Sequence, residues 1–148
     1  MTDSRIEKSA RRGYGAGLIF TLLVAVSGQV LLGRLPEGQT ALEAVRDFGY
    51  TLTGISLLGG LLLAARGKAI LGRLPKLAPQ RLRRFIYREY LAIAFACALS
   101  TVFGMVYWGL GGRQVERHAR TFIALGPCAF LALAVRPSRW AAGPPDAA

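Results

Sequence analysis

Residues 66–88 read RGKAILGRLPKLAPQRLRRFIYR, and this basic segment decides the fold. It holds 8 of the 19 Lys and Arg residues of the chain, and long apolar runs without charge flank it on both sides. A loop this basic between two runs of membrane-spanning length stays on the cytoplasmic side of a membrane. The segment therefore predicts a membrane protein. It also places the end of the preceding apolar run and the start of the following one on the cytoplasmic side of the membrane.

Four runs of the sequence carry no charged residue. They hold 21 residues between Arg12 and Arg34, 18 between Asp47 and Arg66, 23 between Glu89 and Arg113, and 15 between Arg120 and Arg136. A helix needs about 20 apolar residues to cross a bilayer. The fourth run is short, but the flanking Arg side chains can reach the headgroups and so lengthen it. We expect an all-α polytopic protein with four transmembrane helices, near residues 13–32, 41–65, 90–110 and 119–140. The third should be preceded by amphipathic helical turns that start after Pro79, with Leu82, Phe85 and Ile86 on one face and Arg81, Arg84 and Arg88 on another.

The distribution of positive charge predicts the orientation. The two tails and the central loop hold 14 Lys and Arg residues, and the two other loops hold 5. Both termini should then be cytoplasmic, with residues 1–12 as a basic tail, 13–140 as one membrane domain and 141–148 as a disordered tail. Arg outnumbers Lys 16 to 3, and Ala, Gly and Leu are abundant, which is typical of a GC-rich bacterial genome. We therefore expect a multi-pass protein of the bacterial cytoplasmic (inner) membrane.

The basic loop suggests a binding surface as well as a topology signal. The net charge of +11 lies mostly at the expected bilayer edge, where anionic lipid headgroups are nearer partners than nucleic acid. We therefore expect no nucleic-acid binding, and either anionic headgroups or an acidic partner at the loop. The residues expected to make this contact are Arg73, Lys76, Arg81, Arg83, Arg84 and Arg88.

The third apolar run carries a ridge of small residues. Ala92, Ala96, Ser100 and Gly104 follow one another at intervals of four, so they share one helix face. Small residues let helices approach closely in lipid. We expect this ridge to be a helix-packing interface, covered by the first or second helix or by a helix of another subunit, with part of it facing another subunit.

Glu89 is the only acidic residue between the basic loop and the far end of the third run. It has no basic residue three or four positions away, so its partner should come from another helix. Arg11 and Arg12 are the expected partners, which would make Glu89 part of an ion pair at the membrane interface. A contact with a substrate or an ion is the alternative.

The four uncharged runs contain no ionisable residue apart from Cys and Tyr, which argues against chemistry inside the membrane. The single His residue, His118, lies in a loop, and no Cys and His set has the spacing of a zinc site. Cys97 and Cys128 lie at lipid depth, where small apolar packing residues are the simpler interpretation. We expect no catalytic residue, no cofactor and no metal.

Residues 29–84 resemble the small four-helix membrane subunit of TRAP-type transporters. The similar elements, in order, are Gln29-Val30 with Arg34, Glu43 with Arg46, Arg66-Gly67, Leu74-Pro75 and Arg83-Arg84. The chain departs from that family pattern because no Trp precedes the Glu and no His follows Arg-Gly. The resemblance implies a non-catalytic subunit that works beside a larger permease.

These patterns predict a non-catalytic accessory or assembly subunit that packs against partner helices, with a protein partner or a homo-oligomer in the membrane. A TRAP-like small subunit of a transporter and a homo-oligomeric pore are the alternatives. A membrane enzyme that uses the cytoplasmic Arg and Tyr residues is a further one.

Overall fold

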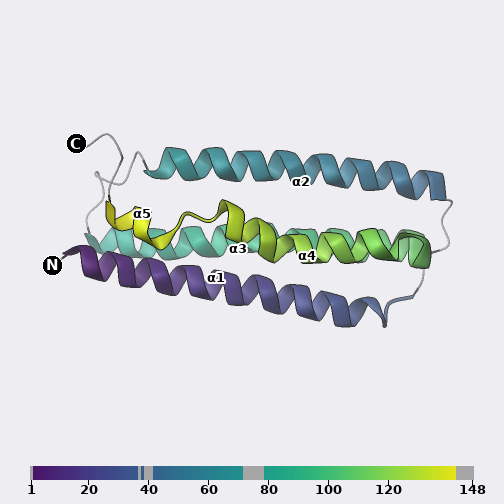
Figure 1. Cartoon of the computed structure of the whole chain (residues 1–148), viewed down its shortest axis with the longest axis horizontal. Coiled ribbons are helices and arrows are strands. Elements are labelled where there is room, and N and C mark those ends of the chain that lie inside the picture. The colour runs from purple at the N-terminus through teal and green to yellow at the C-terminus, as the bar shows by residue number, and fades with distance from the viewer. Residues whose placement is uncertain (1, 37, 39–41, 72–78, 143–148) are drawn as a thin grey trace.

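The computed structural model describes residues 2–36, 38, 42–71 and 79–142 (Figure 1). Within these residues the chain is helical and contains no strand. The elements in chain order are α1 (Thr2–Leu32), α2 (Leu42–Leu71), α3 (Pro79–Gly111), the 3₁₀ turn η2 (Gly112–Val115), α4 (Glu116–Leu133) and α5 (Pro137–Ala142). The predicted all-α class is confirmed.

Three helical stretches are long and apolar enough to cross a membrane. They are Ile6–Leu32, Glu43–Ile70 and Arg81–Trp140. The third stretch holds both α3 and α4, which run antiparallel and are joined through η2 (Figure 1). The chain therefore has the helical content of a membrane protein.

The long helices lie roughly parallel, with α3 and α4 between α1 and α2 (Figure 1). Their buried residues form two clusters, one toward each end. One cluster holds Ala10, Ile86, Tyr90 and Phe130, and the other holds Leu32, Tyr107 and Ile123, among others. The first cluster also contains Trp140 of α5, so both ends of the described chain meet at the end of the molecule where α3 begins.

Two helices are longer than the sequence predicted. α1 begins at Thr2, so residues 2–12 continue the first helix instead of forming a separate tail. An ion pair one turn apart supports this extension, with 2.7 Å between Arg11 Nη2 and Glu7 Oε1. α2 continues to Leu71 and so takes Arg66 and Lys68 of the basic segment into the helix.

The fourth helix ends earlier than predicted. α4 stops at Leu133, and Ala134 has an extended backbone with ψ of 130°. Pro137 then begins α5, and a residue that precedes proline disfavours the helical conformation. The predicted helix 119–140 is thus two helices, 116–133 and 137–142. In a continuous helix the Pro137 ring would clash with the Leu133 carbonyl and could not donate a hydrogen bond to it, and α4 ends at Leu133. Ala141 and Ala142 belong to α5, and residues 143–148 of the predicted disordered tail lie outside the described residues.

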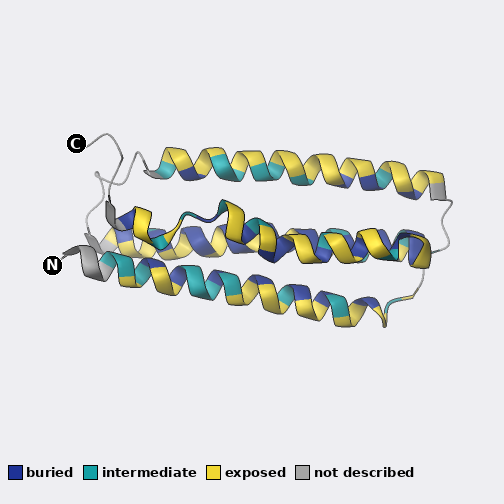
Figure 2. Ribbon diagram, in the orientation of Figure 1, coloured by how far each residue is buried: buried dark blue, intermediate teal, exposed yellow. Residues whose placement is uncertain are grey.

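α2 is the most exposed of the long helices (Figure 2). Leu61 and Leu62 are 68% and 71% exposed, and Leu57 and Leu58 are similarly open. In water such a helix would be an aggregation hazard, because contiguous exposed apolar surface associates. In a bilayer the same surface contacts lipid tails without penalty.

Candidate functional site

The first turns of α3 build a basic surface. Leu82 and Ile86, four residues apart, are buried against the neighbouring helices, and Phe85 is half-buried. The Arg side chains between them are forced to the exposed side by the same helical period. The exposed residues on these turns are Arg81, Arg83, Arg84 and Arg88. The predicted separation of an apolar and a basic face is confirmed here.

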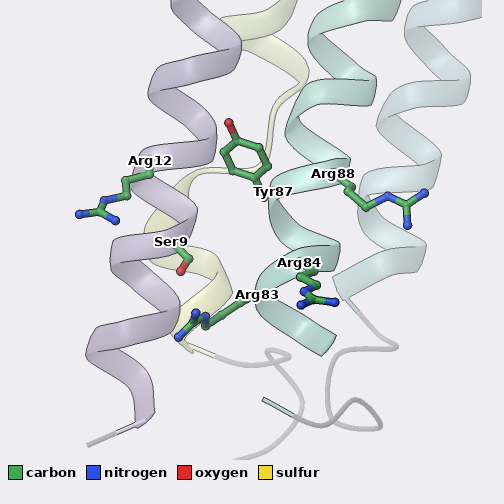
Figure 3. Close-up of a pocket in the computed structure, with 6 residues that line it drawn as sticks. All are labelled: Ser9, Arg12, Arg83, Arg84, Tyr87 and Arg88. Atoms are coloured by element: carbon green, nitrogen blue, oxygen red, sulfur yellow. The ribbon is translucent and has the colours of Figure 1, made fainter. Parts of the chain in front are cut away.

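A basic hollow of about 560 Å³ lies between α1 and the start of α3 (Figure 3). Its lining residues are Ser9, Arg12, Arg83, Arg84, Tyr87 and Arg88. Ser9 and Arg83 lie toward each other between the two helices, while Arg88 points toward α2. Among the described residues, none of these four Arg side chains has a carboxylate partner.

A second basic hollow, of about 550 Å³, lies on the α2 side of α3. Arg84 and Arg88 line both hollows, and Arg81 and Arg66 line only this one. The basic surface therefore wraps around α3 from α1 to α2. Of the residues expected to contact an anionic group, Arg73 and Lys76 lie outside the described residues.

Glu89 forms an ion pair with Arg66 of α2. Arg66 Nε lies 2.8 Å from Glu89 Oε1, and Arg66 Nη2 lies 3.0 Å from Glu89 Oε2. This two-point geometry is the strongest that a guanidinium makes with a carboxylate. Arg11 is bound to Glu7 instead. The structure thus corrects the predicted partner of Glu89, which is neither Arg11 nor Arg12.

The sequence held a signal for this partner. Arg66 ends the uncharged run of the preceding helix, and consecutive elements are usually neighbours in space. A partner from the N-terminal segment is expected only if Arg66 lies in a loop. Once α2 continues to Leu71, Arg66 is held on a helix beside α3 and can reach Glu89.

The ridge of small residues is covered in part by α4. A Cβ atom on Gly104 would lie 2.6 Å from the carbonyl oxygen of Ala119, and Ser100 packs beside Gly126. The expected cover was α1, α2 or another subunit, so α4 is a correction for this half of the ridge. Ala96 is half-buried and Ala92 is exposed, and both face hollows shared with α2.

An apolar hollow of about 340 Å³ lies between α2, α3 and α4. On its walls, Gly59 and Gly60 of α2 lie opposite Ala96 and Ser100 of α3. The Ser100 hydroxyl donates to the Cys97 carbonyl oxygen at 2.8 Å, so it offers no free donor to the hollow. The lining is therefore apolar in character.

An aromatic cluster fastens α5 to the helices. The Trp140 indole N–H donates to the Tyr90 hydroxyl at 2.8 Å, and that hydroxyl donates to the Val135 carbonyl oxygen at 2.6 Å. Tyr14 of α1 packs edge-on against Tyr90, with ring centroids 5.7 Å apart. No local sequence pattern indicates this cluster, since its members are far apart along the chain.

The other end of the molecule has its own polar contacts. Arg120 donates to the Gln29 side-chain oxygen at 3.0 Å and to Glu116 at 2.9 Å. Gln29 in turn donates to the backbone oxygen of Arg120 at 3.1 Å. This set joins α1 to the start of α4.

No group of three or more His, Cys, Asp or Glu side chains in the described part of the chain could hold a metal ion. Cys97 is buried and Cys128 is exposed, and both are free thiols. His118 is exposed on α4. Compared with protein families, with curated proteins and with solved structures, the chain has no match. The resemblance to TRAP small subunits stays a prediction.

Proposed function

We propose that the chain is a four-span protein of the bacterial cytoplasmic membrane. Support comes from the third apolar stretch, Arg81–Trp140, which is 60 residues long and folds back on itself through η2. α3 has 33 residues and α4 has 18, and a span needs about 17–25 residues. Each of the two helices is thus long enough for its own crossing.

In this proposal both termini and the basic end of α3 face the cytoplasm. The end with α5 and the start of α3 carries Lys68, Arg81, Arg83, Arg84, Arg88 and Arg139, all exposed. The same end also carries Arg12, Arg66 and Arg136, whereas the described part of the opposite end carries five Arg residues, of which Arg120 is partly neutralised by Glu116. An excess of Lys and Arg marks the cytoplasmic side of a membrane protein.

Thiol labelling of intact cells tests this topology. On a background in which Cys97 and Cys128 are replaced by Ala, Ser138→Cys should be shielded from an impermeant maleimide. Gln114→Cys, in η2 at the other end, should be labelled. Both positions are exposed, so the difference reports the side of the membrane. Labelling in the reverse order would overturn the proposed orientation.

We propose further that the protein is a non-catalytic accessory subunit, and that the free face of α2 binds a transmembrane helix of a partner protein. The observation that carries this proposal is Gly54. It is exposed among Leu57, Leu58 and Leu61, and a Cβ atom there would meet nothing within 4 Å. Lipid tails fill smooth and rough surfaces alike, whereas a neighbouring helix approaches closest at a small residue.

Photocrosslinking in native membranes tests the partner. A photoreactive residue at Leu58 should give one discrete crosslinked product, and Gly54→Leu should remove most of it because bulk separates the helices. A photoreactive residue at Leu23, 61% exposed on α1, is the control and should give no such product. Gly109→Leu is the matched control for the substitution, since Gly109 also has open space around it.

Two results would contradict this interface. Equal crosslinking from Leu58 and Leu23 would mean that α2 is covered by lipid only. A product with twice the mass of the chain would favour self-assembly, which is the homo-oligomer alternative.

A further inference from the structure

We infer that the groove between α2 and α3 binds one phospholipid with an anionic headgroup. The phosphate would lie in the basic hollow beside Arg81, Arg84 and Arg88, and an acyl chain would lie in the apolar hollow beside Ala96. This inference concerns the inward side of α2 and does not depend on the partner proposed for its outward face.

The two hollows follow each other along the same groove. Ala92 lines the basic hollow and Ala96 the apolar one, one helical turn apart on α3. On the facing helix, Arg66 lines the basic hollow and Leu62 the apolar one, again one turn apart. A polar compartment is thus followed directly by an apolar compartment on both walls.

The charge of the basic hollow fits a phosphate. Four Arg side chains and one carboxylate line it, and that carboxylate, Glu89, is already bound to Arg66. Arg81, Arg84 and Arg88 have no acidic partner among the described residues, which leaves three uncompensated guanidinium groups. A guanidinium group can donate two parallel hydrogen bonds to the oxygens of one phosphate. Each further guanidinium group in the hollow adds positive charge that attracts the anionic phosphate.

The dimensions fit a lipid and not a soluble anion. From Arg88 to Ser100 the groove extends roughly 18 Å along α3 at about 1.5 Å per residue. A lipid acyl chain that follows the groove over this distance would reach from the headgroup region to about the middle of a bilayer, whose hydrocarbon core is about 30 Å thick. The small residues on both walls, Gly59 and Ala96 among them, leave room there that their own helices do not fill.

α2 is held in a way that keeps the groove open. The Arg66–Glu89 ion pair fastens it at the basic end, and Gly49 packs against Tyr107 at the other end. Between these two contacts the helices are spaced by the apolar hollow. Because α2 is fixed at both ends, it cannot easily move onto α3 to close the apolar hollow. A bound lipid chain can fill the hollow instead.

The test measures lipid binding by the purified full-length protein in detergent, with native mass spectrometry as the readout. The probe is dioleoyl phosphatidylglycerol, and dioleoyl phosphatidylcholine is the neutral reference. The wild type should retain phosphatidylglycerol selectively. Arg81→Gln with Arg88→Gln should weaken that binding by roughly tenfold or more, because each cation near an anionic headgroup contributes about 1 kcal/mol.

The matched control is Arg136→Gln with Arg139→Gln. It removes the same charge from the same end of the molecule, but neither residue lines either basic hollow. This variant should change phosphatidylglycerol binding less than threefold. Equal losses in the two double variants would mean general attraction to a basic surface and would overturn the inference.

A second arm tests the acyl chain. Ala96→Phe should fill the apolar hollow and weaken lipid binding, and Gly59→Leu should do the same from the opposite wall. Glycerophosphoglycerol, the headgroup without acyl chains, should bind far more weakly than the lipid. If it binds equally well and neither substitution has an effect, the site takes a soluble anion and the lipid inference is wrong. If Ala96→Phe or Gly59→Leu instead releases a copurifying protein, the hollow holds a helix of that protein and the lipid inference is also wrong.

Discussion

Replacing Arg66 by Met should lower the free energy of unfolding by about 2–3 kcal/mol, measured by SDS titration in mixed micelles. The reason is an asymmetry in the pair, since the Glu89 side chain is 7% exposed and the Arg66 side chain is 57% exposed. Removing one member of a buried pair costs about 3–5 kcal/mol, and the exposure of Arg66 reduces that figure. In Arg66→Met the carboxylate stays buried without its partner.

Three further variants test this explanation. Glu89→Gln should cost only about 1 kcal/mol, because the released Arg66 is free to be hydrated. Arg66→Met combined with Glu89→Met should be more stable than Arg66→Met alone, since no charge then remains buried. Arg83→Met, a substitution of an exposed Arg with no acidic partner among the described residues, should change stability by less than about 0.5 kcal/mol. If Arg66→Met has no larger effect than Arg83→Met, the pair does not fasten α2.

The helical class and its approximate segments followed from the sequence for a simple reason. Long uncharged runs have few folded alternatives to helices, because backbone groups in lipid must bond within their own segment. The amphipathic start of α3 was equally predictable, since Leu82 and Ile86 repeat with the helical period. These features depend on local pattern alone.

The partners of individual residues did not follow from the sequence, because they depend on how the helices are arranged around one another. The sequence predicts a partner for Glu89 on α1, but α2 extends far enough to place Arg66 beside it. The ridge from Ala92 to Gly104 lies on one helix, as its spacing predicts, but the spacing does not indicate that α4 covers half of it. A row of small residues predicts that another helix packs closely against it, but it does not predict which helix.

The break between α4 and α5 has a local signal in the sequence, which is Pro137. A continuous helix through Arg136-Pro137 would give the short fourth apolar run the length of a membrane span. The tendency of residues before proline to leave the helical conformation opposes that extension. α5 turns instead to place Trp140 on Tyr90, where its N–H has a partner.

The close approach of α3 and α4 at Gly104 gives the last prediction. Gly104→Ala should lower the free energy of unfolding by about 2 kcal/mol, because overpacking costs about 1–3 kcal/mol. The new Cβ would lie 2.6 Å from the Ala119 carbonyl oxygen and 2.6 Å from Cγ1 of Ile123, which is fully buried. A flexible side chain could move aside, but the Ala119 contact is with the α4 backbone, so the whole helix must shift.

Gly109→Ala is the matched control on the same helix. A Cβ atom at Gly109 meets nothing within 4 Å, and alanine is favoured over glycine in a helix by up to about 1 kcal/mol. This variant should therefore be as stable as the wild type or slightly more stable. If the ridge instead met only another subunit at Gly104, both variants would unfold alike and Gly104→Leu would dissociate a complex without weakening the monomer. If Gly104→Ala lowers the free energy of unfolding of the monomer and Gly109→Ala does not, this half of the ridge belongs to the α3–α4 contact.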